Sequence, residues 1–168
     1  MAIAVGQNAT RSMTVTSDTV RRYGELTGDR NPLHFDEEFA ARTRFGRLIS
    51  QGGIAVGLVH ALVAMDLPVP GTVFTEQQWM FPAPVYIGDT ISVEGRITEW
   101  RESRNRGEME FVVVNQEGVE VLRAPPAFTG LSLPFDRITV EFPTGRRKLG
   151  KTDLRARLYS KSAGVEPR

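Results

Sequence analysis

The strongest constraint on the fold is an apolar stretch near the middle of the chain. From Ile54 to Met65 every residue except His60 is apolar or glycine. A helix that is apolar on every side should be buried. The stretch is also shorter than the roughly 20 residues that a membrane span requires. We therefore expect a buried helix in the middle of the chain.

The segments that could enclose this helix follow it in the sequence. Four of them have the composition of strands: 72–81, 90–100, 107–114 and 119–133. In the run from 90 to 100, apolar residues alternate with polar ones, which predicts a strand with one buried face. The pair Pro125-Pro126 interrupts the last run and indicates an edge or a bulge. One helix against several antiparallel strands is an α+β architecture.

The segment before the central helix is predicted to be mixed. Residues 12–16 alternate weakly and indicate a short strand. A helix then begins near Ser17 or Asp18, because a short side-chain oxygen accepts hydrogen bonds from the first free N–H groups of a helix. Its buried face is predicted from three residues spaced three apart: Val20, Tyr23 and Leu26. Residues 36–41 indicate a helical turn, and residues 43–49 a loop.

The turn between these two helical segments holds one of the two histidines, His34, and a carboxylate, Asp29. Gly28 relaxes the backbone limits at its start, and Pro32 fixes its own φ angle. The helix should therefore end near Thr27. A carboxylate and an imidazole held on such a turn can share one water molecule and act as an acid–base pair. Local chemistry alone also allows an ordinary helix-ending turn.

The same turn does not predict a metal site. Counting Asp29 as the first residue of a calcium loop places His34 where the loop needs glycine and Ala40 where it needs glutamate. The chain also has no cysteine, which excludes disulfides, thiolate nucleophiles and Cys-based metal sites. Its N-terminus lacks the basic start and long apolar run of a signal peptide. We expect a soluble, cytoplasmic protein that does not enter a membrane.

Charge divides the chain into two parts. Residues 1–133 contain twelve Arg, no Lys and sixteen acidic residues, whereas residues 134–168 contain nine basic and four acidic residues. We expect one domain over 1–133 and a basic, partly disordered C-terminal extension over 134–168. The basic residues are not interleaved with aromatic ones, so we do not expect nucleic-acid binding.

A dense pattern surrounds the Asp29–His34 turn. It consists of Tyr23, Leu-Thr-Gly-Asp at 26–29, Asn-Pro-Leu-His at 31–34 and Ala40. The pattern resembles the signature of the MaoC-like, (R)-specific enoyl-CoA hydratases. A looser likeness extends from about 14 to 133 and includes a Pro-x-x-x-Gly-Asp run at 84–89. The resemblance implies a hot-dog fold, in which an antiparallel sheet wraps around a long central helix.

The resemblance also implies roles for individual residues. Asp29 and His34 would be the catalytic pair that holds and activates water. The remaining candidates would bind or orient the substrate: Asn31, Gln51, Gly52, Gly53 and His60. The first N–H groups of a helix have no helical partner and lie at the positive end of its dipole, so Gly52, with Gly53, would stabilise a thioester oxygen.

Two of these positions depart from the family pattern. Gln51 occupies a position where the family often has histidine, and a glutamine donates hydrogen bonds but does not change its charge. His60 occupies a position where relatives tend to have a small polar residue. On an apolar helix, such a histidine more often lines the core or a pocket than acts as a base.

By the same resemblance, the reaction adds water to a 2-enoyl thioester or removes it from a 3-hydroxyacyl thioester. It needs no metal or redox cofactor, since coenzyme A or acyl carrier protein enters as part of the substrate. A homodimer is expected, and a heteromer stays open. The phosphates of either carrier could be attracted by the basic extension or by Arg42, Arg44 and Arg47, although a solvated loop is the simpler interpretation of these arginines.

Three alternatives remain at this point. The chain could be a hot-dog acyl-thioester hydrolase, which would use a carboxylate on the central helix or a facing strand. It could be one subunit of a heteromeric 3-hydroxyacyl-acyl-carrier-protein dehydratase. It could also be a non-catalytic acyl-thioester sensor, although the presence of both Asp29 and His34 argues against that.

Overall fold

One antiparallel sheet forms the frame of the molecule. The computed structural model describes residues 3–69, 71–124, 130–133, 140–142 and 145–147. Six strands form the main sheet: β1 (Asn8–Thr14), β2 (Val73–Phe74), β3 (Thr90–Arg101), β4 (Arg106–Val114), β5 (Glu120–Ala124) and β6 (Gly130–Ser132). Their order is β1-β3-β4-β6-β2, and β5 pairs with β4 beside β6. A separate two-stranded sheet joins β7 (Val140–Phe142) and β8 (Gly145–Arg147).

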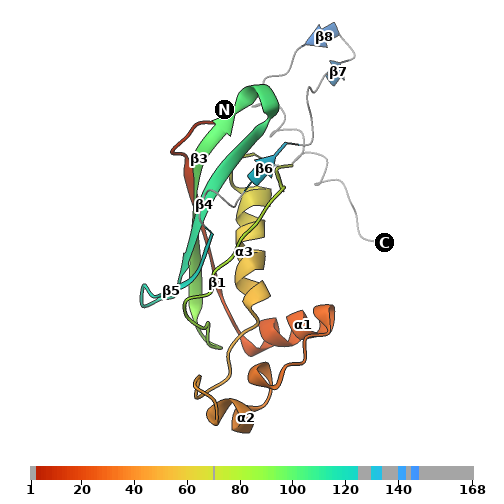
Figure 1. The fold of residues 1–168 in the computed structure, drawn as a ribbon. Helices are drawn as coiled ribbons and strands as arrows, with labels where there is room; N and C mark the ends of the chain where they lie inside the picture. Colours follow the sequence, from red (N-terminus) through yellow and green to blue (C-terminus); the bar gives the residue numbers. More distant parts are fainter. Residues whose placement is uncertain (1–2, 70, 125–129, 134–139, 143–144, 148–168) are drawn as a thin grey trace, which may run out of the picture.

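The helices lie on one side of this sheet. The longest is α3 (Gly52–Met65), and it runs along the sheet (Figure 1). Two shorter helices, α1 (Ser17–Thr27) and α2 (Glu37–Ala41), lie at the end of the molecule where α3 begins. Single 3₁₀ turns form η1 (Pro32–His34), between α1 and α2, and η2 (Glu102–Arg104), between β3 and β4. The prediction of one long helix packed against antiparallel strands is confirmed.

The core lies between α3 and the sheet. The helix buries six apolar side chains on one face: Ile54, Ala55, Leu58, Val59, Leu62 and Val63. The sheet contributes Ile91, Val93 and Ile97 from β3 and Met109, Phe111 and Val113 from β4. Burying a side chain of this size contributes about 1.5–3 kcal/mol. A Cβ at Gly95 would lie 2.8 Å from the Phe111 ring and 3.0 Å from Leu62, so glycine permits this close packing.

The other face of α3 was predicted incorrectly. Although the sequence suggested burial on all sides, Gly57, His60 and Ala64 are exposed, and Met65 is 44% exposed. In the described part of the chain, the main sheet covers one face of the helix. An apolar sequence indicates that a helix is to be buried, but not that its own chain does so.

The observed end of α1 agrees with the predicted end, whereas its N-cap residue differs from the predicted one. Thr16, not Ser17 or Asp18, caps the helix, and its side chain accepts a hydrogen bond from Thr19 N–H. The helix ends at Thr27, as predicted, because Gly28 adopts a left-handed conformation with φ of 78°. At Asp18, a hydrogen bond from Arg21 holds the pKa of the carboxyl below its usual value.

The packing face of α1 also differs from the prediction. Val20 is buried, but Leu26 is 85% exposed, so the expected face does not extend to the end of the helix. Gly24 is buried instead. A Cβ at this position would lie 2.8 Å from the ring of Phe35 and 2.9 Å from the carbonyl oxygen of Asp29. The helix therefore contacts the following turn through a residue without a side chain.

Several strand predictions need new bounds. The first strand covers 8–14 rather than 12–16, and the run at 72–81 forms regular strand only at 73–74. The runs at 90–100 and 107–114 are confirmed as β3 and β4. The last run is two strands, β5 and β6, on either side of the proline pair. Pairing with β3, β4 or β6 decided these bounds, and composition alone does not specify which strand a segment pairs with.

The basic extension over 134–168 lies almost wholly outside the described residues, so that prediction stays untested. Within the described ranges, no helix has the length and hydropathy that a membrane span requires. The cytoplasmic location also stays a prediction.

Candidate active site

The turn after α1 is held by hydrogen bonds within itself. One carboxylate oxygen of Asp29, Oδ1, accepts a hydrogen bond from the backbone N–H of Asn31 at 3.2 Å. The side-chain oxygen of Asn31 accepts one from Leu33 N–H at 3.0 Å and caps η1. Asn31 therefore orients Asp29 through its backbone, while its side chain starts the short helix that carries His34.

Ile49 connects this turn to the beginning of α3. Its backbone N–H donates to the carbonyl of Leu33 at 3.1 Å, and its carbonyl lies 2.8 Å from Nδ1 of His34. Because a carbonyl oxygen only accepts hydrogen bonds, this contact assigns the proton of the neutral imidazole to Nδ1. The lone pair is then on Nε2. His34 is 8% exposed, so the bond is shielded from solvent.

The carboxylate of Asp29 faces this lone pair. Its Oδ2 lies 3.7 Å from Nε2 of His34, and the side chain of Asp29 is 41% exposed. Two acceptors at this separation do not bond directly, but a single bridging water can donate one hydrogen to each. The geometry therefore suits the activation of a water molecule that reaches the pair from solvent.

The beginning of α3 lies close to the same turn. Gln51 is the N-cap residue, but its side chain forms no cap hydrogen bond. Instead its Nε2 donates to the carbonyl of Val20 on α1 at 3.3 Å. The first backbone bond of the helix joins Ile54 N–H to Gln51 O, which leaves the N–H groups of Gly52 and Gly53 outside the regular helical pattern.

The two glycines differ in their surroundings. A Cβ at Gly53 would lie 1.8 Å from the hydroxyl oxygen of Tyr23, so only glycine fits there. A Cβ at Gly52 would lie 3.0 Å from the ring of Phe81, and Gly52 is exposed. Gly53 therefore permits close packing of α3 on α1, whereas the backbone of Gly52 is exposed beside the ring of Phe81.

A cavity of about 490 Å³ lies beside His34 and Gly52, and both residues line it. Its apolar wall includes Ala55, Val85 and Val121, all buried. Of the predicted site residues, His34 and Gly52 line this cavity, and Asp29 does not line it but lies 3.7 Å from His34. The side chains of Asn31 and Gln51 contact backbone groups of Leu33 and Val20 instead.

His60 lies on the exposed face of α3 and is not among the residues that line the cavity. Its ring packs against Phe74, with 4.9 Å between centroids, and its Nε2 lies 2.9 Å from Nε2 of Gln77. The structure does not bring this residue together with His34. A role for His60 in binding the acyl chain stays a prediction.

Most of the residues that line the cavity were not singled out from the sequence as binding residues, among them Phe81, Tyr86 and Ser50. The first two belong to the Pro-rich loop between β2 and β3, and the third precedes α3. The Pro-x-x-x-Gly-Asp run was a signal that this loop is structured, but the sequence did not show which of its residues face the cavity. Among the described residues, no three His, Asp or Glu side chains gather as a metal site would require.

Comparison with known proteins identifies the family. The family model for the MaoC-like domain matches residues 2–119. The chain belongs to the MaoC-like family. This MaoC-like protein is 39% identical over 107 residues to a 3-hydroxybutyryl-CoA dehydratase of Methylorubrum extorquens, covering 64% of the chain and 68% of the relative. It is 32% identical over 117 residues to an (R)-specific enoyl-CoA hydratase of Aeromonas caviae, covering 70% of the chain and 87% of that enzyme.

Solved structures agree with this assignment. The (R)-hydratase from A. caviae superposes with a TM-score of 0.73 at 30% identity, over 79% of this chain and 98% of that one. An R-hydratase from Pseudomonas aeruginosa superposes with a TM-score of 0.71 at 32% identity, over 83% of this chain and 87% of that one. The prediction of a hot-dog fold for the MaoC-like chain is confirmed.

Proposed function

We propose that this MaoC-like protein is a hydro-lyase that adds water to a 2-enoyl thioester or removes it from an (R)-3-hydroxyacyl thioester. The observation that carries the proposal is the 3.7 Å gap between Nε2 of His34 and Oδ2 of Asp29, next to a cavity. Relatives that are named as an enoyl-CoA hydratase and a 3-hydroxybutyryl-CoA dehydratase support the same class of reaction.

The catalytic pair has a defined task in this reaction. A water bound between Asp29 and His34 passes one proton to the pair, and its oxygen bonds to the β-carbon of the enoyl group. The pair returns a proton to the α-carbon, so that one water is added in total. Since the carbonyl of Ile49 holds Nδ1–H, Nε2 is the nitrogen that can exchange this proton. Positioned acid–base catalysis of this kind contributes roughly 10²- to 10⁴-fold.

The beginning of α3 supplies the second part of the mechanism. As oxygen bonds to the β-carbon, negative charge develops on the thioester oxygen. Gly52 lines the cavity at the positive end of the α3 dipole, and its N–H would donate a hydrogen bond to this oxygen. One donor of this type lowers the barrier by about 3–4 kcal/mol. No side chain at position 52 blocks the approach of the substrate.

The thioesterase alternative finds less support in the geometry. The first carboxylate along α3 is Asp66, at the opposite end of the helix from Gly52. It is paired with Arg11, whose Nε lies 2.8 Å from Asp66 Oδ2. A carboxylate that is remote from the cavity and paired with an arginine is poorly placed to activate water there.

Hydration of crotonyl-CoA and of a medium-chain trans-2-enoyl-CoA tests the proposal. We expect the wild-type protein to remove the enoyl absorbance and to form the (R) product. Asp29→Asn should lower kcat by roughly 10²- to 10⁴-fold, because asparagine does not accept the proton. Asp18→Asn, on the exposed side of α1, is the matched control and should retain activity.

Two results would contradict the proposal. One is a folded wild-type protein that hydrates neither substrate, and the other is an Asp29→Asn variant with unchanged kcat. Release of free thiol in the same assay would support the hydrolase instead. Circular dichroism of each variant shows whether a loss of activity reflects a loss of folding.

We also propose that a second copy of the chain covers the exposed face of α3. This face carries Gly57, Ala64 and Met65, and apolar surface of this kind is typical of an interface. Sedimentation should then give twice the chain mass of 18.7 kDa. Ala64→Glu should reduce it to the mass of one chain, whereas Val112→Glu, on an exposed position of β4, should not. A wild-type protein with the mass of one chain would contradict this proposal.

A further inference from the structure

The solvent end of the cavity carries positive charge. Among the described residues that line the cavity, none is Asp or Glu, and Arg44 is a permanent cation. Arg44 is exposed, whereas Val85 and Val121 on the inner wall are buried. The charged end of the cavity therefore faces solvent, and the apolar end faces the core. A ligand that fits this distribution is uncharged at one end and anionic at the other.

A second arginine lies at the same end. The guanidinium carbon of Arg47 is 3.9 Å from the centroid of the Tyr86 ring, and that of Arg44 is 4.9 Å from the Phe45 ring. Both rings line the cavity. Neither arginine forms an ion pair within 4.0 Å with a described carboxylate. A guanidinium that stacks on a ring keeps its in-plane N–H donors available for an anion.

The loop that carries these arginines is fixed to the Pro-rich loop that carries Tyr86. The hydroxyl of Tyr86 donates to the carbonyl of Phe45 at 3.3 Å. The backbone N–H of Tyr86 donates to Asp89 Oδ2 at 2.9 Å, and Asp89 is 5% exposed. Gln116 donates to the other oxygen of that carboxylate at 3.0 Å. Because the ring under Arg47 is held at both ends, little order has to be gained when an anion binds.

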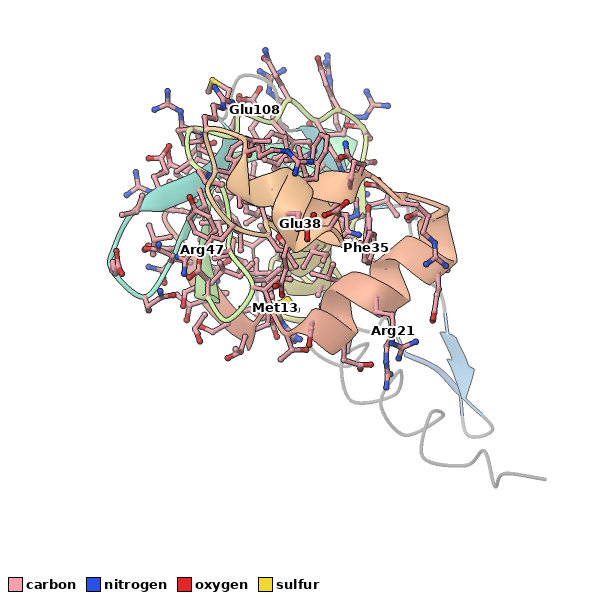
Figure 2. All side chains as sticks on the ribbon, turned by 90° about the horizontal axis from the view of Figure 1, so that it is seen from below. Met13, Arg21, Phe35, Glu38, Arg47 and Glu108 are labelled. Atoms are coloured by element: carbon pink, nitrogen blue, oxygen red, sulfur yellow. The ribbon has the colours of Figure 1, made fainter. Side chains whose placement is uncertain are left out.

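Figure 2 views the molecule from the end that carries α1 and α2. Arg47 lies on the other side of the view from Arg21, with Glu38 between them. Arg21 forms ion pairs with Asp18 and Glu25, with N···O distances of 2.5 and 2.6 Å. The arginines of the helix surface are thus neutralised by their own helix, whereas those beside the cavity are not.

We propose that Arg44 and Arg47 form the binding site for a phosphate group on the carrier of the thioester. The proposal rests on the proposed function, since it assigns the anionic end of the same substrate. A guanidinium presents a planar fork of N–H donors that matches two phosphate oxygens. The acyl end of the substrate would extend toward Gly52 and His34. The phosphate belongs to phosphopantetheine, which coenzyme A and acyl carrier protein share, or to the nucleotide of coenzyme A.

Binding measurements without turnover test this site. Coenzyme A, 3′-dephospho-coenzyme A, 4′-phosphopantetheine and pantetheine are titrated into the wild-type protein by calorimetry. The same titrations use Arg44→Ala, Arg47→Ala and, as the matched control, Arg42→Ala. Arg42 belongs to the same loop and is exposed, but among the described residues it neither lines the cavity, as Arg44 does, nor stacks on a ring that lines it, as Arg47 does. All three substitutions remove an exposed side chain, so each variant should stay folded.

We expect Arg44→Ala and Arg47→Ala each to weaken coenzyme A binding by about tenfold, which is about 1.4 kcal/mol, because each variant loses a hydrogen bond between charged groups. Pantetheine binding should not change, nor should binding to Arg42→Ala. A parallel loss for 4′-phosphopantetheine would assign the phosphate that both carriers share. A loss restricted to coenzyme A would assign a nucleotide phosphate. In the hydration assay, KM for an enoyl-CoA should rise while kcat stays constant.

These measurements test the phosphate site separately from the proposed hydro-lyase activity. If the wild-type protein binds coenzyme A through these arginines but hydrates no enoyl-CoA, the phosphate site stands and the reaction was assigned wrongly. Equal affinity of Arg44→Ala, Arg47→Ala and the wild type for every phosphate-bearing probe would overturn the site, whatever the activity. Absence of wild-type binding to all of these probes would also overturn it.

Discussion

The chain has two histidines, and the structure places them in opposite surroundings. His34 is buried on η1, its Nδ1 is bound to the Ile49 carbonyl, and its Nε2 faces Asp29. His60 is exposed on α3, where its ring packs on Phe74 and its Nε2 contacts an amide. The first imidazole has a fixed tautomer and a carboxylate beside its lone pair. The second has neither.

This difference shows what makes a histidine a candidate base. The residue type is the same in both places. A base also needs a backbone acceptor that fixes one nitrogen and an open path to the other. At His34, the carbonyl of Ile49 fixes Nδ1 and Nε2 faces the partly exposed carboxylate of Asp29, whereas neither feature is present at His60.

Substitution of each histidine by glutamine gives the largest expected difference. His34→Gln can retain a hydrogen bond to the Ile49 carbonyl but accepts no proton, so kcat should fall by roughly 10²- to 10⁴-fold. His60→Gln should leave kcat close to that of the wild type. The measurement is the initial rate of enoyl-CoA hydration at saturating substrate. An equal loss of kcat in the two variants would contradict the conclusion that His34, and not His60, is the candidate base.

Gly53 and Gly57 lie about one turn apart on α3, and alanine substitutions at the two positions should change the free energy of unfolding differently. In Gly53→Ala the new Cβ would lie 1.8 Å from the Tyr23 hydroxyl, so the variant should lose about 1–3 kcal/mol, as overpacked sites do. In Gly57→Ala the Cβ meets no heavy atom of the same chain within 4 Å, so a chain without a partner on this face should gain about 0.5–1 kcal/mol from the lower backbone entropy of the unfolded chain.

Urea denaturation of the two glycine variants measures both changes. The contact of α1 with α3 would be looser than the structure indicates if Gly53→Ala were as stable as the wild type. A destabilised Gly57→Ala would mean that another surface packs closely on this face of α3, as the proposed second copy would.

Two glutamines give the smallest expected effects. Gln51 is 2% exposed, and no hydrogen-bond partner reaches its Oε1 among the described residues. Gln51→Leu removes a long bond to Val20 together with this unpaired oxygen, so the net change should stay within about 1 kcal/mol. Gln77→Leu, which removes the partner of the exposed His60, should change stability by about 0.5 kcal/mol or less.

Thermal unfolding of both glutamine variants checks these values. If Gln51→Leu lost several kcal/mol, the oxygen would have a bound partner in solution. If that variant instead kept its stability and raised KM, Gln51 would contact substrate, as the sequence predicted. Neither change is expected for Gln77→Leu, which is the control at the surface.

The sequence by itself determined the local features of this protein. Gly28 ends α1 because a left-handed residue terminates a helix, and the alternation from 90 to 100 specifies a strand with one buried face. The family pattern placed Asp29 and His34 on one turn. Such features depend on neighbours within a few residues, so the order of residues is sufficient to predict them.

Contacts between distant segments decided the rest. The exposure of Leu26 and of one face of α3 depends on what packs there, which no local pattern records. The tautomer of His34 depends on Ile49, fifteen residues away, and the position of Arg47 depends on Tyr86 in another loop. Composition showed that the central helix is apolar and that the loop before it is basic. Only the tertiary structure placed Gly52, at the beginning of that helix, and Arg44 at the same cavity, because folding brings separate segments together.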